Sequence, residues 1–179
     1  MGTGIIVCGL NGSGKSTLGA ALSERLGFHF IDLENLYFPK NDPNDPYASP
    51  RSEEEVGKLL ADEIKAHENF VFAAVRGNYG EDVRSFYQLA ILIEVPKEIR
   101  MQRIRNRSFQ KFGSRMLPGG DLYEREEAFF KMVESRQDNY AENWLESVDC
   151  PVIRIDGTKT IEENVTFIIE QLQGKIDIH

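Results

Sequence analysis

Five short runs of apolar residues recur along the chain, and each ends in glycine or is followed by proline or a charged residue. They cover residues 4–9, 28–31, 70–75, 89–95 and 152–155. Because apolar residues follow one another without alternation, the runs predict strands covered on both faces, as in a parallel sheet. We therefore expect a central parallel sheet between layers of helix.

Between these runs, apolar residues recur at the helical spacing. Leu18, Leu22 and Leu26 share one face of a helix predicted over residues 15–26, and Gly27 predicts its end. Four prolines between residues 39 and 51 predict a loop. The further helices, two of which open on a Ser-x-x-Glu or Thr-x-x-Glu capping box, are predicted over residues 52–67, 96–107, 122–145 and 160–174. This alternation of strand and helix predicts a three-layer α/β sandwich.

Length and composition bound the class of protein. The 179 residues predict a single domain over 1–179 with a proper hydrophobic core. A net charge of −8 argues against general nucleic-acid binding, which depends on neutralising phosphates. No apolar run approaches the ~20 residues of a membrane span. The two cysteines, Cys8 and Cys150, are interpreted as small buried apolar residues of a cytoplasmic protein.

Residues 9–16, Gly-Leu-Asn-Gly-Ser-Gly-Lys-Ser, fit the phosphate-loop pattern G-x-x-x-x-G-K-[ST] between a strand and a helix. Glycines let backbone amides turn toward phosphate oxygens, and the following helix aims its positive end at them. Lys15 is expected to reach the outer phosphates, and Ser16 to bind Mg²⁺. The residues predicted to hold ATP are Gly9, Asn11, Gly12, Ser13, Gly14, Lys15, Ser16 and Thr17.

Asp32 and Glu34 follow the second predicted strand. The carboxyl ends of parallel strands meet at one rim, so these carboxylates are expected beside the phosphate loop. One can orient metal-bound water while the other takes a proton from an acceptor hydroxyl. The alternative is that Asp32 caps a helix and Glu34 is merely solvated.

Six cations and no acidic residue lie between residues 100 and 115. Arg100, Arg103, Arg107 and Lys111 fall three or four residues apart, on one helical face, where they can clamp phosphate charge. A solvated basic face or a small nucleic-acid patch are the alternatives. Residues 117–120, Leu-Pro-Gly-Gly, predict a hinge.

Three other features are more ambiguous. Arg136 lies four residues before Tyr140 and either reaches back to the phosphates or pairs on the surface. Residues 156–159 either support a nucleotide base or form a plain turn. The histidines at 29, 67 and 179 have no metal-ligand company in the sequence, so no zinc site is predicted.

Together these residues resemble the small P-loop kinases of the adenylate kinase and shikimate kinase type, over nearly the whole chain. The resemblance implies the strand order 2-3-1-4-5 and a lid over about residues 104–122. Arg103 and Arg107 match the start of that lid, with Lys111 and Arg115 inside it. Arg136 matches an arginine after the lid that contacts phosphate. The adenine-contacting loop is similar to Gly157, Thr158 and Lys159.

On the acceptor side, Asp32-Leu33-Glu34 looks like the Asp-x-Asp of shikimate and gluconate kinases. By resemblance, Asp32 supports Mg²⁺, and Glu34 holds or deprotonates the acceptor. Residues 76–80 replace the Asp-Gly-x-Pro-Arg of adenylate kinases and are closer to the glycine-rich substrate loop of shikimate kinases. The segment 36–67 is expected to close over the acceptor. The remaining candidates for acceptor binding are Arg51, Arg76, Gly77 and Arg115.

The leading hypothesis is therefore a monomeric or homodimeric kinase that transfers the ATP γ-phosphate to a small-molecule acceptor. Its predicted catalytic residues are Lys15, Asp32, Glu34, Arg103 and Arg107. The alternative hypothesis is a nucleotide-dependent regulatory or binding module with weak ATPase activity. A GTP switch is disfavoured because the chain lacks an Asn-Lys-x-Asp guanine motif.

Overall fold

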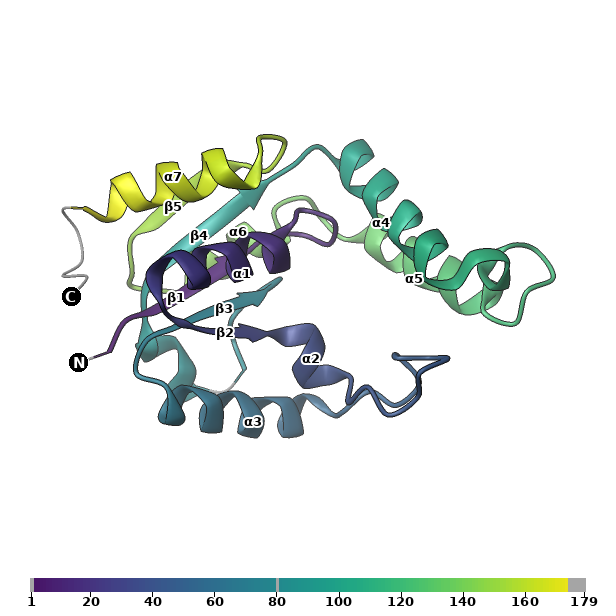
Figure 1. Ribbon diagram of the computed structural model, residues 1–179, viewed down its shortest axis with the longest axis horizontal. Helices are drawn as coiled ribbons and strands as arrows, with labels where there is room; N and C mark the ends of the chain where they lie inside the picture. The colour runs from purple at the N-terminus through teal and green to yellow at the C-terminus, as the bar shows by residue number, and fades with distance from the viewer. Residues whose placement is uncertain (1, 80, 174–179) are drawn as a thin grey trace.

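The computed structural model describes residues 2–79 and 81–173, so the predictions that fall on Gly80, Gly174 and His179 lie outside the described residues. Five parallel strands form one sheet in the order β2-β3-β1-β4-β5, which confirms the predicted order. The strands are β1 (Gly4–Cys8), β2 (His29–Asp32), β3 (Phe70–Ala74), β4 (Tyr87–Glu94) and β5 (Val152–Asp156). Figure 1 shows them running side by side.

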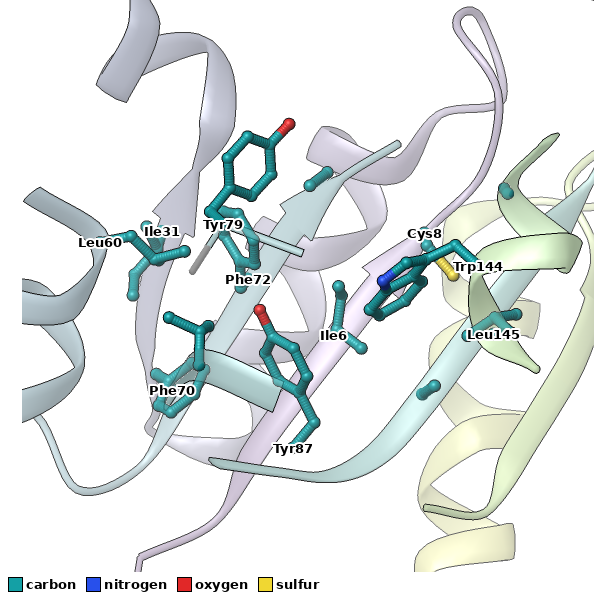
Figure 2. Close-up of a cluster of buried hydrophobic side chains, with 14 of the residues drawn as sticks. Ile6, Cys8, Ile31, Leu60, Phe70, Phe72, Tyr79, Tyr87, Trp144 and Leu145 are labelled. Carbon is teal, nitrogen blue, oxygen red and sulfur yellow. The ribbon is translucent and has the colours of Figure 1, made fainter. Parts of the chain in front are cut away.

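Helices cover both faces of the sheet. On one face, α1 (Lys15–Leu26) and α7 (Ile161–Leu172) pack Leu22 and Ile168 against the sheet. On the other face, α3 (Glu53–Ala66) contributes Leu60, and α6 (Tyr140–Leu145) contributes Trp144 (Figure 2). Burial of these apolar faces is the main stabilising term, at roughly 25 cal/mol per Å². The predicted three-layer sandwich is confirmed.

The central strands match the prediction of two covered faces better than the edge strands do. All five residues of β1 and of β3 are buried. In β5, however, buried and exposed residues alternate, with Val152, Arg154 and Asp156 exposed. The expectation that every strand is covered on both faces is therefore wrong for β5, because it lies at the sheet edge.

A helical hairpin rises from the rim of the sheet (Figure 1). It consists of α4 (Lys97–Phe112), the 3₁₀ helix η2 (Gly113–Met116) and α5 (Tyr123–Ser135). Ile104, Phe112 and Phe130 lie in an apolar cluster of its own. The predicted helix over 96–107 therefore runs on to Phe112, whose side chain is buried in that cluster.

The single helix predicted over residues 122–145 is wrong. Its path is broken at Arg136, which has extended backbone (φ −66°, ψ 132°), and α6 begins only at Tyr140. The break separates two packing tasks. Phe130 and Val133 belong to the hairpin cluster, whereas Trp144 belongs to the sheet core.

Two short elements complete the described chain. The helix α2 (Leu33–Tyr37), which the sequence pattern did not predict, follows β2 directly, and the 3₁₀ helix η1 (Glu81–Phe86) precedes β4. Both cysteines are free thiols; Cys8 is buried beside Trp144 in the core (Figure 2), and Cys150 is half-buried. Among the described helices, none has the length and apolar character needed to cross a membrane.

Candidate functional site

The glycine-rich loop between β1 and α1 adopts a conformation that only glycine accommodates easily. Gly12 and Gly14 have φ of 82° and 93°. A Cβ at Gly12 would lie 2.6 Å from the carbonyl oxygen of Arg100, so this glycine permits close packing against the start of α4. A Cβ at Gly14 would meet nothing within 4 Å. The loop is therefore closed on one side and open on the other, where α1 begins.

The loop has polar groups suited to phosphate and Mg²⁺. Among the described residues, the Ser13 hydroxyl is buried without a hydrogen-bond partner, which is costly unless a ligand satisfies it. Ser16 and Asp32 line one cavity together, and their hydroxyl and carboxylate oxygens are the hard ligands that Mg²⁺ prefers. These residues fit the predicted triphosphate and metal.

The cavity beside the loop has a volume of about 230 Å³ and joins three parts of the chain. The loop contributes Lys15 and Ser16, the β2–α2 junction contributes Asp32 and Glu34, and the hairpin contributes Arg107. Aromatic rings close the remaining sides; they belong to Tyr37, Phe38, Tyr47 and Phe129. The structure thus brings together four of the five predicted catalytic residues.

Asp32 caps a helix, as the alternative interpretation expected, and its side chain also lines the cavity. Its Oδ1 accepts a hydrogen bond from the backbone N–H of Glu34 at 3.0 Å, so it caps α2. The same side chain lines the cavity with Lys15. The cap turns the chain so that Glu34, in the first turn of α2, also faces the cavity.

Lys15 has a shifted acid–base equilibrium. Burial, together with the positive charge of Arg107, lowers the pKa of its ammonium group from 10.5 to about 8. The carboxylates of Asp32 and Glu34 oppose this effect. The surroundings of Lys15 therefore carry too little negative charge to balance its ammonium group. An anionic ligand supplies the missing charge.

Arg103 connects the phosphate loop to the loop after β5. Its guanidinium donates to the carbonyl oxygens of Gly12 at 3.3 Å and of Gly157 at 3.0 Å. A cavity of about 330 Å³ beside it includes Gly157 and Lys159. A smaller one, about 150 Å³, lies over the loop and is lined by both Arg103 and Arg107.

The loop after β5 contributes two of its three predicted residues to the larger of these cavities. Gly157 must be small, since a Cβ there would lie 2.4 Å from Val95. Thr158 is exposed and donates its hydroxyl to Asp156, and it is not among the residues that line this cavity.

The basic face of α4 does not act as one unit. Arg100 is buried and donates to the carbonyl oxygen of Val95 and to Asp138, which makes its contacts structural.

Arg136, at the end of α5, reaches back to the phosphate loop. Its Nη1 lies 2.6 Å from Oδ1 of Asn11, and its guanidinium stacks over the Tyr140 ring at 4.9 Å.

Four predicted acceptor-binding residues lie elsewhere among the described residues, outside the lining of the 230 Å³ cavity. Arg51 donates to the carbonyl oxygen of Leu36, and Arg76 lies 3.8 Å from Glu53. Gly77 permits close packing, because its Cβ would lie 2.4 Å from Ile6. Arg115 pairs with Asp121 and donates to the carbonyl oxygen of Asn44.

Tyr47 and Lys111 are site residues whose pairing the sequence did not reveal. The Tyr47 hydroxyl donates to Oε1 of Glu34 at 2.7 Å and accepts from the Lys111 ammonium at 2.7 Å. Burial and this bond to Glu34 raise the pKa of Tyr47 well above its usual value. No sequence signal marks Tyr47, because it lies in the proline-rich loop, 13 residues after its partner.

A larger cavity, of about 580 Å³, lies between β4, β5 and α6. Leu10 is the one residue of the phosphate loop that lines this cavity. Arg154 also lines it and forms ion pairs with Glu94 and Glu142. Size alone therefore does not locate the site.

The expectation that the histidines lack metal-ligand company is wrong for two of them. His29 and His67 both lie beside Glu63, although 38 residues separate them in the sequence. The parallel pairing of β2 with β3 brings the end of α3 to the start of β2. This group lies outside the cavity described above.

Comparison with known proteins places this geometry in a family. Residues 5–128, more than half of the chain, match the AAA domain family. The chain belongs to this family. The matched residues contain the phosphate loop and the strands β1 to β4, except for Gly4 at the start of β1.

Individual relatives extend the match to nearly the whole chain. The uncharacterized protein YqaC of Bacillus subtilis (strain 168) is 30% identical over 178 residues, covering 95% of this chain and 97% of that protein. An adenylate kinase isoenzyme 6 homolog of Caenorhabditis elegans is 24% identical and covers 93% and 87%. Among solved structures, shikimate kinase from Aquifex aeolicus vf5 has a TM-score of 0.57 at 20% identity, covering 96% and 97%. The resemblance to P-loop small-molecule kinases is confirmed.

Proposed function

We propose that this protein transfers the γ-phosphate of ATP to a hydroxyl or phosphate group of a small molecule. The observation that carries the proposal is the cavity in which Lys15, Asp32 and Glu34 meet. A phosphate-binding cation and two carboxylates are then arranged around one space, as phosphoryl transfer requires.

On the donor side, the loop amides, Lys15 and Arg136 hold the phosphates, and the cavity lined by Gly157 and Lys159 receives the base. Ser16 and Asp32 would hold Mg²⁺, which neutralises phosphate charge when bound. Arg103 and Arg107 border the small cavity over the loop. Their guanidinium groups stabilise the negative charge that develops on the transferred phosphoryl group.

On the acceptor side, Glu34 is the proton acceptor. An acceptor hydroxyl hydrogen-bonded to Glu34 replaces the Tyr47 hydroxyl, which occupies that position in the structure. The hydroxyl oxygen attacks the γ-phosphorus in line, the bond between that phosphorus and the leaving oxygen of ADP breaks, and the hydroxyl proton passes to Glu34.

The hairpin and the segment 36–67 are proposed to close over the acceptor. They already touch: Arg125 pairs with Asp45 at 2.5 Å, and Arg115 donates to the carbonyl oxygen of Asn44 at 2.7 Å. Closure keeps water from competing with the acceptor for the phosphoryl group. The proposed lid is larger than residues 104–122, since it includes all of α4 and α5.

The test is ATP turnover and product formation across a panel of metabolites, with three variants. Lys15→Met is expected to weaken ATP binding and abolish transfer. Glu34→Gln is expected to keep ATP binding and lower kcat by about 10²–10⁴-fold, because the proton acceptor is lost. Glu24→Gln, on the exposed side of α1, is the charge-matched control and should behave as the wild type.

Two outcomes would contradict the proposal. One is transfer at the wild-type rate by Lys15→Met. The other is slow ATP hydrolysis that no metabolite stimulates and that Glu34→Gln leaves unchanged. The second outcome, together with an ATP-dependent change in affinity for a protein partner, would favour the regulatory module instead.

A further inference from the structure

A second polar cluster lies at the amino ends of the strands, whereas the phosphate loop lies at their carboxyl ends. It joins the first residue of β2, His29, to Glu63 in the last turn of α3 and to His67, the residue that caps α3. β2 has four residues, and at ~3.3 Å per residue His29 lies roughly 10 Å from Asp32 at the other end. The cluster is therefore separate from the proposed Mg²⁺ site.

The three side chains converge on one point. Nε2 of His29 lies 2.7 Å from Oε2 of Glu63, and Nε2 of His67 lies 3.9 Å from the same oxygen. The ligand atoms of all three residues lie within 4.8 Å of one another. The two imidazole rings stack with centroids 3.6 Å apart and planes 14° apart, so both nitrogens face the carboxylate together.

The backbone holds these side chains in position. The N–H of His29 donates to the carbonyl oxygen of Asn69 at 3.0 Å, and His29 is in register with Phe70 of β3. Glu63 lies in the last turn of α3, and the N–H of His67, the residue after the helix, donates to the carbonyl oxygen of Glu63 at 3.1 Å. The cluster is thus built on a strand and a helix, the elements that position ligands best.

The chemistry of the cluster suits a first-row transition ion. Two imidazoles and one carboxylate are a common set for Zn²⁺, and the negative end of α3 favours a cation beside His67. The side chains are 34–42% exposed, so water can supply a fourth ligand. With bond lengths of ~2.0–2.2 Å, the ligand atoms of a tetrahedral ion lie roughly 3.3–3.6 Å apart. Nε2 of His29 and Oε2 of Glu63 must therefore separate and Nε2 of His67 must draw in, which rotation of half-exposed side chains allows.

We propose that His29, Glu63 and His67 form a Zn²⁺ site that joins the edge strand β2 to α3. The ion replaces the hydrogen bond between His29 and Glu63 with two metal–ligand bonds. Because it links two elements that otherwise meet through side-chain contacts, bound Zn²⁺ stabilises the folded chain. This proposal does not depend on the kinase function.

The experiment is calorimetric titration of the metal-free full-length protein with Zn²⁺ at pH 7.5, without nucleotide or Mg²⁺. The wild type is expected to bind one ion per chain. His67→Gln and Glu63→Gln each remove one of three ligands and are expected to weaken the affinity about 100-fold. Asp62→Asn, an exposed carboxylate on the same helix, is the matched control.

Two further measurements identify the ligands. Co²⁺ at this site is expected to give visible absorption without the near-ultraviolet band of a thiolate ligand, which excludes Cys8 and Cys150 as ligands. Asp32→Asn is expected to bind Zn²⁺ like the wild type, which separates this site from the phosphate loop. The proposal is overturned if the wild type fails to bind Zn²⁺ at about 100 μM. It is also overturned if His67→Gln binds Zn²⁺ as tightly as Asp62→Asn does.

Discussion

At the scale of single residues, Lys15 shows how the site is prepared for its ligand. Its ammonium group lies in a cavity that burial and the neighbouring Arg107 make unfavourable for positive charge. The carboxylates of Asp32 and Glu34 compensate only in part, because the pKa of Lys15 is still lowered to about 8. Bound phosphate removes this deficit and restores a higher pKa.

Binding of ATP is therefore expected to take up protons. Below pH 7, Lys15 is already protonated, and uptake by this group is close to zero. At pH 8.5, Lys15 is partly deprotonated in the free protein, and the raised pKa in the complex draws up a fraction of a proton per site. Calorimetry in two buffers of different ionisation enthalpy measures this number. Equal uptake by Lys15→Met at pH 8.5 would assign it to another group.

At the scale of elements, the contact between the hairpin and the proline-rich segment is the feature that shapes the acceptor side. It comprises Arg125 with Asp45, Arg115 with the carbonyl oxygen of Asn44, and Lys111 with Tyr47. The segment has no strand or helix between residues 39 and 51, so these contacts decide its position. The pair of Arg125 and Asp45 is the most direct one to test.

Asp45→Asn is expected to loosen the segment. The hydrogen bond with Arg125 lowers the pKa of Asp45. The charged pair is therefore fully formed at pH values above the ordinary pKa of a carboxyl group, and it is lost only as the pH falls through the lowered pKa. An exposed or half-buried ion pair contributes about 1 kcal/mol. Its loss in Asp45→Asn is therefore expected to make cleavage of residues 39–51 in limited proteolysis roughly fivefold faster.

Asp42→Asn is the control for this prediction, because it removes a charge from the same segment and keeps an oxygen for the bond from the Asn44 N–H. Equal cleavage rates for the two variants would show that the ion pair does not hold the segment.

The capping box of α7 gives a second prediction at this scale. The Thr160 hydroxyl accepts from the backbone N–H of Glu163, whose carboxylate in turn accepts from Thr160. Thr160→Ala removes the cap and is expected to lower the free energy of unfolding by about 1 kcal/mol in urea denaturation. Thr166→Ala, in the exposed interior of the same helix, is expected to change it by less than about 0.5 kcal/mol. Equal losses would argue against the cap.

At the scale of the whole molecule, stability depends on the middle of the sheet more than on its edges. Val7 in β1 is 0% exposed, between β3 and β4, whereas Val152 in the edge strand β5 is 40% exposed. The same substitution at the two positions therefore compares the core with the edge directly.

Val7→Ala is expected to lower the free energy of unfolding by about 2–3 kcal/mol, since it removes buried methyl groups and leaves a cavity. Val152→Ala is expected to cost less than about 1 kcal/mol. Urea denaturation of the two variants gives the difference. A cost at Val152 equal to that at Val7 would mean that the edge is covered in solution.

Local pattern and global fold agree over most of the chain. Continuous apolar runs predicted the five strands, and the two capping boxes form as predicted at Ser52 and Thr160. The errors arose where neighbours far along the chain decide the outcome. The 122–145 pattern remains helical on both sides of Arg136, and only the separate packing of Phe130 and Trp144 breaks it. Likewise, Val152, Arg154 and Asp156 are exposed because β5 lies at the edge of the sheet, a position that the resemblance implied but that the apolar run 152–155 does not encode by itself.

By itself, the sequence determined the phosphate loop, since its glycines, Lys15 and Ser16 act through local backbone geometry at one turn. It also determined that Asp32 and Glu34 lie at the same rim, because strand ends of a parallel sheet converge. Only the tertiary structure decided the partners of these residues. Tyr47 meets Glu34, Arg136 meets Asn11, and His29 meets His67 through contacts between separate elements. Such contacts depend on how elements pack, a property that residue spacing does not contain.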